Sequence, residues 1–68
     1  MKLSARNILT GTVVEVVRGA TTAHVKLDVD GTTITSSITN EAADDLALEV
    51  GQKAHAVVKA SDVLIAVD

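Results

Sequence analysis

The dominant pattern along the chain is an alternation of apolar and polar residues, which predicts β-strands. Residues 53–59 alternate in this way, and residues 12–17 are dense in the β-branched side chains that favour strands. The pattern is clearest over residues 22–30, where one face would carry Ala23, Val25, Leu27 and Val29. We expect each of these segments to bury one face and expose the other.

Two turns connect the early strands. Residues 18–21 form the first turn, in which we expect Gly19 to adopt a positive φ because glycine has no Cβ. Asp30-Gly31 is the strongest hairpin signal in the chain, and it joins the second strand to a third over residues 32–38.

Residues 39–48 break the alternation and predict one short helix. Thr39 or Asn40 supplies a capping side chain, and acidic residues in the first turns suit the positive end of the helix dipole. Apolar residues lie at helical spacing, namely Ala42, Ala43 and Leu46. Residues 49–52 end the helix.

The complete order of elements predicts the fold. The first strand is expected to include Ser4, and a tight turn at residues 60–62 leads into a final strand over residues 63–67. Five strands with a helix between the third and fourth are typical of an OB-like barrel, a fold that removes sheet edges by closure. We therefore predict a single domain over residues 1–68, all-β with one short helix, folded as a five-stranded OB-like barrel.

The composition predicts an oligomer. The 68 residues include no Cys and no Phe, Tyr or Trp, yet 47% are hydrophobic. A domain this small needs a source of stability beyond its own core. Without Cys, neither a disulfide framework nor a thiolate metal site can supply it. Association with further copies of the chain is the remaining way to stabilise the fold.

The charge disfavours whole classes of partner. Six Lys and Arg against nine Asp and Glu give a formal net charge of −3, which argues against nucleic acid or an anionic membrane. An OB-like barrel that binds single-stranded nucleic acid needs a basic groove and aromatic platforms, and this chain has neither. With no apolar run of membrane-spanning length, we expect a soluble, cytoplasmic protein.

Hydrogen-bond donors gather in three segments. The first strand carries Ser4, Arg6 and Asn7, the third ends in a run of hydroxyls up to Thr39, and the fourth ends in Lys59-Ala60-Ser61. We expect the ends of the third and fourth strands to lie close together. Such donors suit a small tetrahedral dianion, because a monoprotonated anion would direct its own hydroxyl at a donor, a mismatch that costs about 1–3 kcal/mol.

Other interpretations of the polar residues are also open. Ser4, Arg6 and Lys59 could bind carboxylates or carbonyls across an interface, which would make the protein a purely structural or regulatory oligomer without a free ligand. His24 and His55 each stand alone, as expected of surface or interface residues rather than metal ligands. No nucleophile, base and orienting group are grouped, so we predict no enzyme, with Asp44 and Asp45 on a solvated helix face.

Three segments resemble the molbindins, small molybdenum-pterin-binding (Mop) proteins that consist of one TOBE-type domain. They are residues 2–11, with Ser4-Ala5-Arg6-Asn7, residues 34–39, and residues 56–63, with Val58-Lys59-Ala60-Ser61. The resemblance implies an OB-type domain whose subunits exchange N-terminal strands, with three dimers forming a homohexamer. It also implies storage of molybdate or tungstate between subunits, with no further cofactor; the ligand is the oxyanion rather than a pterin.

The resemblance also implies which residues bind. Ser4, Arg6 and Asn7 of one subunit would meet Thr39, Lys59 and Ala60 of a neighbour, with Ala60 binding through its backbone N–H. The full set is Ser4, Ala5, Arg6, Asn7, Thr39, Lys59, Ala60 and Ser61. A related domain has a second hydroxyl where this chain has Ala42, so a contribution there would come from the backbone. A second class of site is placed at the turn Gly19, Ala20, Thr21 and Thr22, beside Arg18; an ordinary hairpin turn is the alternative.

Overall fold

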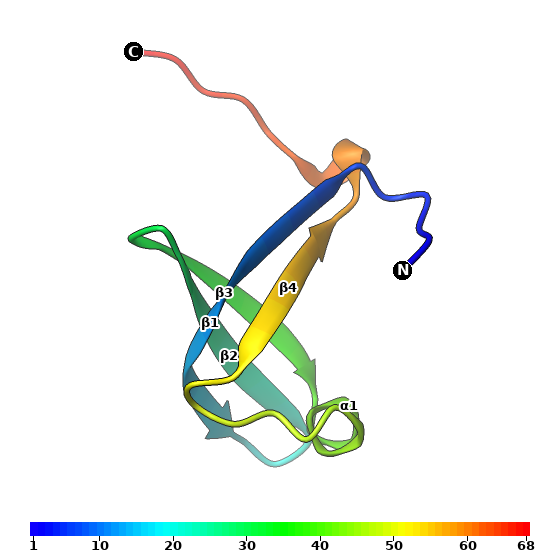
Figure 1. The fold of residues 1–68 in the computed structure, drawn as a ribbon, viewed down its shortest axis with the longest axis vertical. Coiled ribbons are helices and arrows are strands. Elements are labelled where there is room, and N and C mark those ends of the chain that lie inside the picture. The colour runs from blue at the N-terminus through cyan, green and yellow to red at the C-terminus, as the bar shows by residue number, and fades with distance from the viewer.

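A computed structural model describes residues 1–68 as one antiparallel sheet with a short helix across one end (Figure 1). The strands lie in the order β3-β2-β1-β4. The elements are β1 (Asn7–Arg18), β2 (Thr22–Val29), β3 (Thr32–Thr39), α1 (Asn40–Asp45), β4 (Lys53–Val58) and the 3-10 turn η1 (Ala60–Asp62). The mainly β architecture and the single short helix are therefore as predicted.

The long strand β1 joins the two halves of the sheet. Its first half, from Asn7 to Thr12, pairs with β4, and its second half pairs with β2, with a bulge between Val13 and Glu15. At Gly11 a Cβ atom would lie 2.4 Å from the carbonyl oxygen of Asp28, a contact that no side chain tolerates. Gly11 and the bulge together allow β1 to bend, so that the sheet curls.

The core lies inside this curl and is small. Only five of the 68 residues are buried, and they are Val13, Ala23, Val25, Leu27 and Ala43. The predicted inner face of β2 is confirmed, and half-buried alanines of β4 pack against the same cluster. With so little apolar area buried and no aromatic side chain, the single chain has the thin core that its composition predicts.

One of the two early turns differs from the prediction. Asp30 and Gly31 have φ values of 50° and 88°, as the tight hairpin turn requires, so that prediction is confirmed. Gly19 does not have a positive φ. Its amide donates to the carbonyl oxygen of Thr22 at 2.7 Å, and a Cβ atom at Gly19 would lie 3.1 Å from that oxygen, so close approach is what favours glycine there.

The helix α1 begins where the sequence predicts and ends earlier. The hydroxyl oxygen of Thr39 accepts a 3.0 Å hydrogen bond from the amide of Ala42, which makes Thr39 the N-cap. Ala47 has a φ of 49°, a left-handed conformation that cannot continue a helix, so the helix does not reach Leu48. No helix in the structure has the length and apolar character needed to cross a membrane.

The predicted fifth strand and the early start of β1 are wrong for the single chain. Strand β1 starts at Asn7 rather than Ser4, and residues 63–67 form no strand but extend away from the sheet (Figure 1). The exposed fractions of Leu64, Ile65 and Val67 are 92%, 86% and 91%. Neither terminal segment pairs with β3 or β4, so these strands remain the two edges of an open sheet and the barrel is not closed within one chain.

Candidate functional site

The N-terminal donors and the end of β4 lie at the same end of the sheet. Asn7 is opposite Val58 in the β1–β4 ladder, and its side-chain amide donates to the carbonyl oxygen of Val58 at 3.2 Å. This pairing brings the segment that precedes Asn7, with Ser4 and Arg6, toward the segment that follows Val58, with Lys59. We call this group the β1–β4 end.

The β1–β4 end offers charge and hydrogen-bond donors to solvent. Ser4, Arg6 and Lys59 are exposed, and neither cation forms a salt bridge, whereas Arg18 and Lys26 both do. The amides of Ala60 and Ser61 begin η1, and amides at the start of a helical turn have no acceptor inside it. An anion that reached this end would meet two free cations, a hydroxyl and outward amides.

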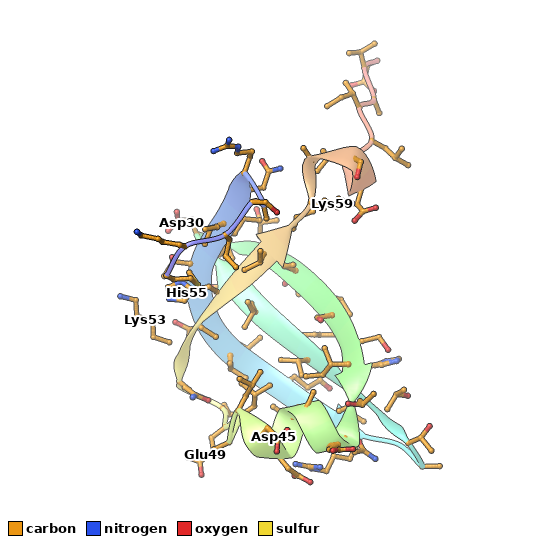
Figure 2. The ribbon with its side chains drawn as sticks, turned by 90° about the vertical axis from the view of Figure 1, so that its right-hand side faces the viewer. Asp30, Asp45, Glu49, Lys53, His55 and Lys59 are labelled. Carbon is orange, nitrogen blue, oxygen red and sulfur yellow. The ribbon has the colours of Figure 1, made fainter.

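Thr39 lies at the opposite end of the sheet. It is paired with Thr22, because β3 ends where β2 begins, whereas β4 ends where β1 begins. Figure 2 shows the same separation, with Lys59 at one end of the ribbon and Asp45 of α1 at the other. The expectation that the ends of the third and fourth strands meet is therefore wrong within one chain, and Thr39 can join Arg6 and Lys59 only across a boundary between two copies.

The hydroxyl group of Thr39 is still available as a hydrogen-bond donor at the end of β3. Its hydroxyl oxygen accepts the hydrogen bond from Ala42, so the hydroxyl proton is free to be donated to a ligand. The backbone amide of Ala42, which we expected to contribute to the site, already donates to the Thr39 hydroxyl oxygen and so is not available to a ligand. In this structure Thr39, rather than Ala42, is the donor available at the start of α1.

The turn before β2 is held against α1. The backbone amide of Asn40 donates to the Thr21 carbonyl at 2.9 Å, and its side-chain amide donates to the Gly19 carbonyl at 3.0 Å. Asp44 and Asp45 are both exposed, as predicted for a solvated helix face, and Asp44 also pairs with Arg18. The predicted second site and Thr39 therefore belong to one hydrogen-bonded unit, which we call the turn end.

The turn end contains a small cleft of about 280 Å³. It is lined by Val17, Arg18, Gly19, Thr22 and His24, of which Arg18, Thr22 and His24 carry side-chain hydrogen-bond donors. The sequence analysis did not place His24 here, although the spacing of two residues from Thr22 along a strand puts both side chains on one face. Ala20 and Thr21 are exposed at the tip of the turn and do not line the cleft.

A larger apolar groove of about 500 Å³ lies between the two open edges of the sheet. It is lined mainly by apolar side chains of β2, β3, β4 and the segment after α1, including Leu27, Ile34, Ile38, Leu48, Ala54 and Val58. The sequence analysis did not predict this groove. The exposed tail of residues 63–67, which a closed barrel would have paired, is the signal that could have indicated it.

The remaining polar candidates form no further centre. The Thr10 hydroxyl and Nδ1 of His55 lie 2.9 Å apart across β1 and β4. The structure contains no group of three or more His, Cys, Asp or Glu side chains arranged to hold a metal ion.

Residues 3–65 match the TOBE domain family, and the chain therefore belongs to that family. Within it, the chain is similar to the Mop proteins, as the sequence motifs indicated. It is 44% identical to a probable molybdenum-pterin-binding protein of Haemophilus influenzae, and the match covers both chains completely. It is 52% identical over 96% of its length to the molybdenum transport protein ModE of Herbaspirillum seropedicae, of which it spans 24%.

Solved structures show the same fold. A molybdate-binding protein from Sporomusa ovata matches with a TM-score of 0.94 and 39% identity over 97% of this chain and 98% of that one. The cytoplasmic molybdate-binding protein ModG, solved with molybdate bound, matches with a TM-score of 0.90 and 52% identity over 94% of this chain and 46% of that one.

Proposed function

We propose that this protein binds molybdate and tungstate at sites shared between copies of the chain. The observation that carries the proposal is the position of Arg6 and Lys59, two cations without carboxylate partners at one end of a sheet whose other end carries Thr39. Relatives described as molybdate-binding proteins support this choice of ligand. The proposed ligands are Ser4, Ala5, Arg6, Asn7, Lys59, Ala60 and Ser61 from one copy and Thr39 from another. This division differs from the one expected from the resemblance, which assigned Lys59 and Ala60 to the neighbour, because Arg6 and Lys59 flank the Asn7–Val58 pair of one chain.

The chemistry of the donors fits a fully ionised tetrahedral oxyanion. Cationic, hydroxyl and amide donors can replace the hydration shell of a dianion from several sides without meeting a proton on the ligand. The proposed mechanism is storage: the oxyanion is captured between copies and released when its free concentration falls. The proposal includes no enzymatic step and no cofactor. The description of ModG as cytoplasmic supports a cytoplasmic location.

Completion of the site requires a second copy, and the fold supports one. The apolar groove and the exposed tail of residues 63–67 are complementary in character, and a five-residue strand spans about 17 Å, close to the length of the six-residue edge strand β4. We propose that this tail supplies the fifth strand to a neighbouring copy and closes its barrel. The exchange of N-terminal strands and the homohexamer, a trimer of dimers, remain predictions alongside it.

The second candidate function is an interaction module without a free ligand. The exposed apolar tail favours it, because a segment of this kind can dock on another protein without any anion. In that case Arg6 and Lys59 would pair with carboxylates of the partner.

Isothermal titration of the purified protein with molybdate, sulfate and phosphate separates the two functions. Storage predicts saturable heat with molybdate and much weaker heat with phosphate, because every phosphate ion carries at least one proton near neutral pH. An interaction module predicts no heat with any of the three anions.

A further inference from the structure

Arg18 takes part in two features of the turn end at once. It lines the small cleft together with Thr22 and His24, and its Nη2 atom lies 2.5 Å from Oδ1 of Asp44 on α1. The side chains of Arg18 and Asp44 are 46% and 65% exposed. An ion pair this open to water is weak and exchanges its partners readily.

The cleft contains side-chain groups that can donate hydrogen bonds to an anion. Thr22 can donate a hydroxyl proton, His24 can donate an imidazole N–H, and no carboxylate is among the residues that line the cleft. The guanidinium of Arg18 is the strongest donor within reach, with five N–H groups in a planar fork. An oxyanion in the cleft would therefore compete with Asp44 for the same guanidinium.

We infer that Asp44 is a built-in competitor that weakens oxyanion binding at the turn cleft. By holding Arg18 on α1, its carboxylate keeps this second site weaker than the site at Arg6 and Lys59, whose cations have no partner within the chain. This inference rests on the proposed function and adds to it a graded order of filling, with the β1–β4 end first and the turn cleft second.

The turn is expected to keep its shape when the competitor is removed. Two hydrogen bonds from Asn40, to the carbonyls of Gly19 and Thr21, hold the turn independently of the Arg18–Asp44 pair. The backbone of Asp44 accepts from the amide of Ala47, which a side-chain substitution leaves in place. Asp44→Asn should thus release Arg18 without unfolding α1.

The test is titration of the full-length assembly with molybdate, comparing Asp44→Asn with Asp45→Asn. Both variants lose one negative charge on the same short helix, but Asp45 forms no salt bridge. We expect Asp44→Asn to tighten the weaker class of sites about two- to fivefold, the gain expected when one exposed ion pair is released. Asp45→Asn should leave that class within error of the wild type, and the tight class should not change in either variant.

The double variant Arg18→Gln/Asp44→Asn decides whether the gain passes through Arg18. We expect it to lose the gain. Retention of the gain in the double variant, an equal gain in Asp45→Asn, or no gain in Asp44→Asn would each overturn the inference. If the wild type lacks the tight class of sites altogether, the proposed function fails, whereas the comparison of the two helix variants at the weak class still decides the role of Asp44.

Discussion

The side-chain amide of Asn7 donates to the carbonyl oxygen of Val58 at 3.2 Å and fixes the first donor segment beside the last strand. Through this contact Arg6 and Lys59, which are distant in sequence, belong to one end of one chain. Thr39 is excluded from that end by its pairing with Thr22. The proposed oxyanion site is therefore divided between copies by the topology of the sheet.

Arg6→Ala should weaken molybdate binding about ten- to a hundredfold, because a hydrogen bond to a charged group contributes about 1.5–3 kcal/mol. Titration calorimetry measures the loss. Lys2→Ala is the matched control, since it removes the same charge from the same exposed segment and should change affinity only slightly. Equal losses in both variants would show that general charge, and not a specific contact, attracts the anion.

Ile65→Asp should disrupt the assembly, because a carboxylate cannot enter an apolar groove without losing its hydration. Sedimentation velocity should show a shift from the wild-type assembly to smaller species. Val50→Asp is the control, since Val50 is exposed in the segment after α1 and does not line the groove. An unchanged assembly in Ile65→Asp would mean that residues 63–67 do not cover a neighbouring copy.

Gly11→Ala should destabilise the fold by about 1–3 kcal/mol, the usual cost of forcing an extra methyl group into a closely packed position. The added Cβ would lie 2.4 Å from the Asp28 carbonyl oxygen and 2.8 Å from the Val29 side chain. Chemical denaturation measures the free energy of unfolding. The neighbouring exposed substitution Thr12→Ala should stay within about 0.5 kcal/mol of the wild type, and a similar value for Gly11→Ala would refute the close approach.

Thr39→Ala should cost about 1 kcal/mol of stability through loss of the helix cap and should also weaken molybdate binding. Thr39→Ser keeps both the cap acceptor and the hydroxyl proton, so it should restore stability and affinity together. Thermal denaturation and calorimetry on the two variants provide the comparison. Full affinity in Thr39→Ala would remove Thr39 from the proposed site.

The sequence was sufficient for three features that depend on local chemistry. The alternation predicted the inner face of β2, the Asp30-Gly31 pair predicted the hairpin, and the capping preference of Thr39 predicted the start of α1. The early end of the helix was missed, because the left-handed φ of Ala47 is unusual for alanine and leaves no pattern in the sequence.

Features that depend on pairing between distant segments could not be predicted from the sequence. Residues 63–67 have the composition of a strand, but they do not pair with the open edge of β3 or β4 in the same chain. The motifs around Arg6, Thr39 and Lys59 identified these residues as candidate donors, and their role in binding stays a prediction. Their division between two ends follows from the register of the ladders, which local patterns do not determine.

Complementation between two defective chains tests the shared site most directly. Arg6→Ala and Thr39→Ala chains with different affinity tags are co-expressed, mixed assemblies are isolated, and molybdate binding is measured. If Arg6 of one copy and Thr39 of another form each site, a mixed pair contains one site with both residues intact, and tight binding returns at that site. Assemblies in which the same chain carries both substitutions beside a wild-type chain serve as the control. Mixed assemblies that bind no better than either variant alone would contradict a site shared between copies.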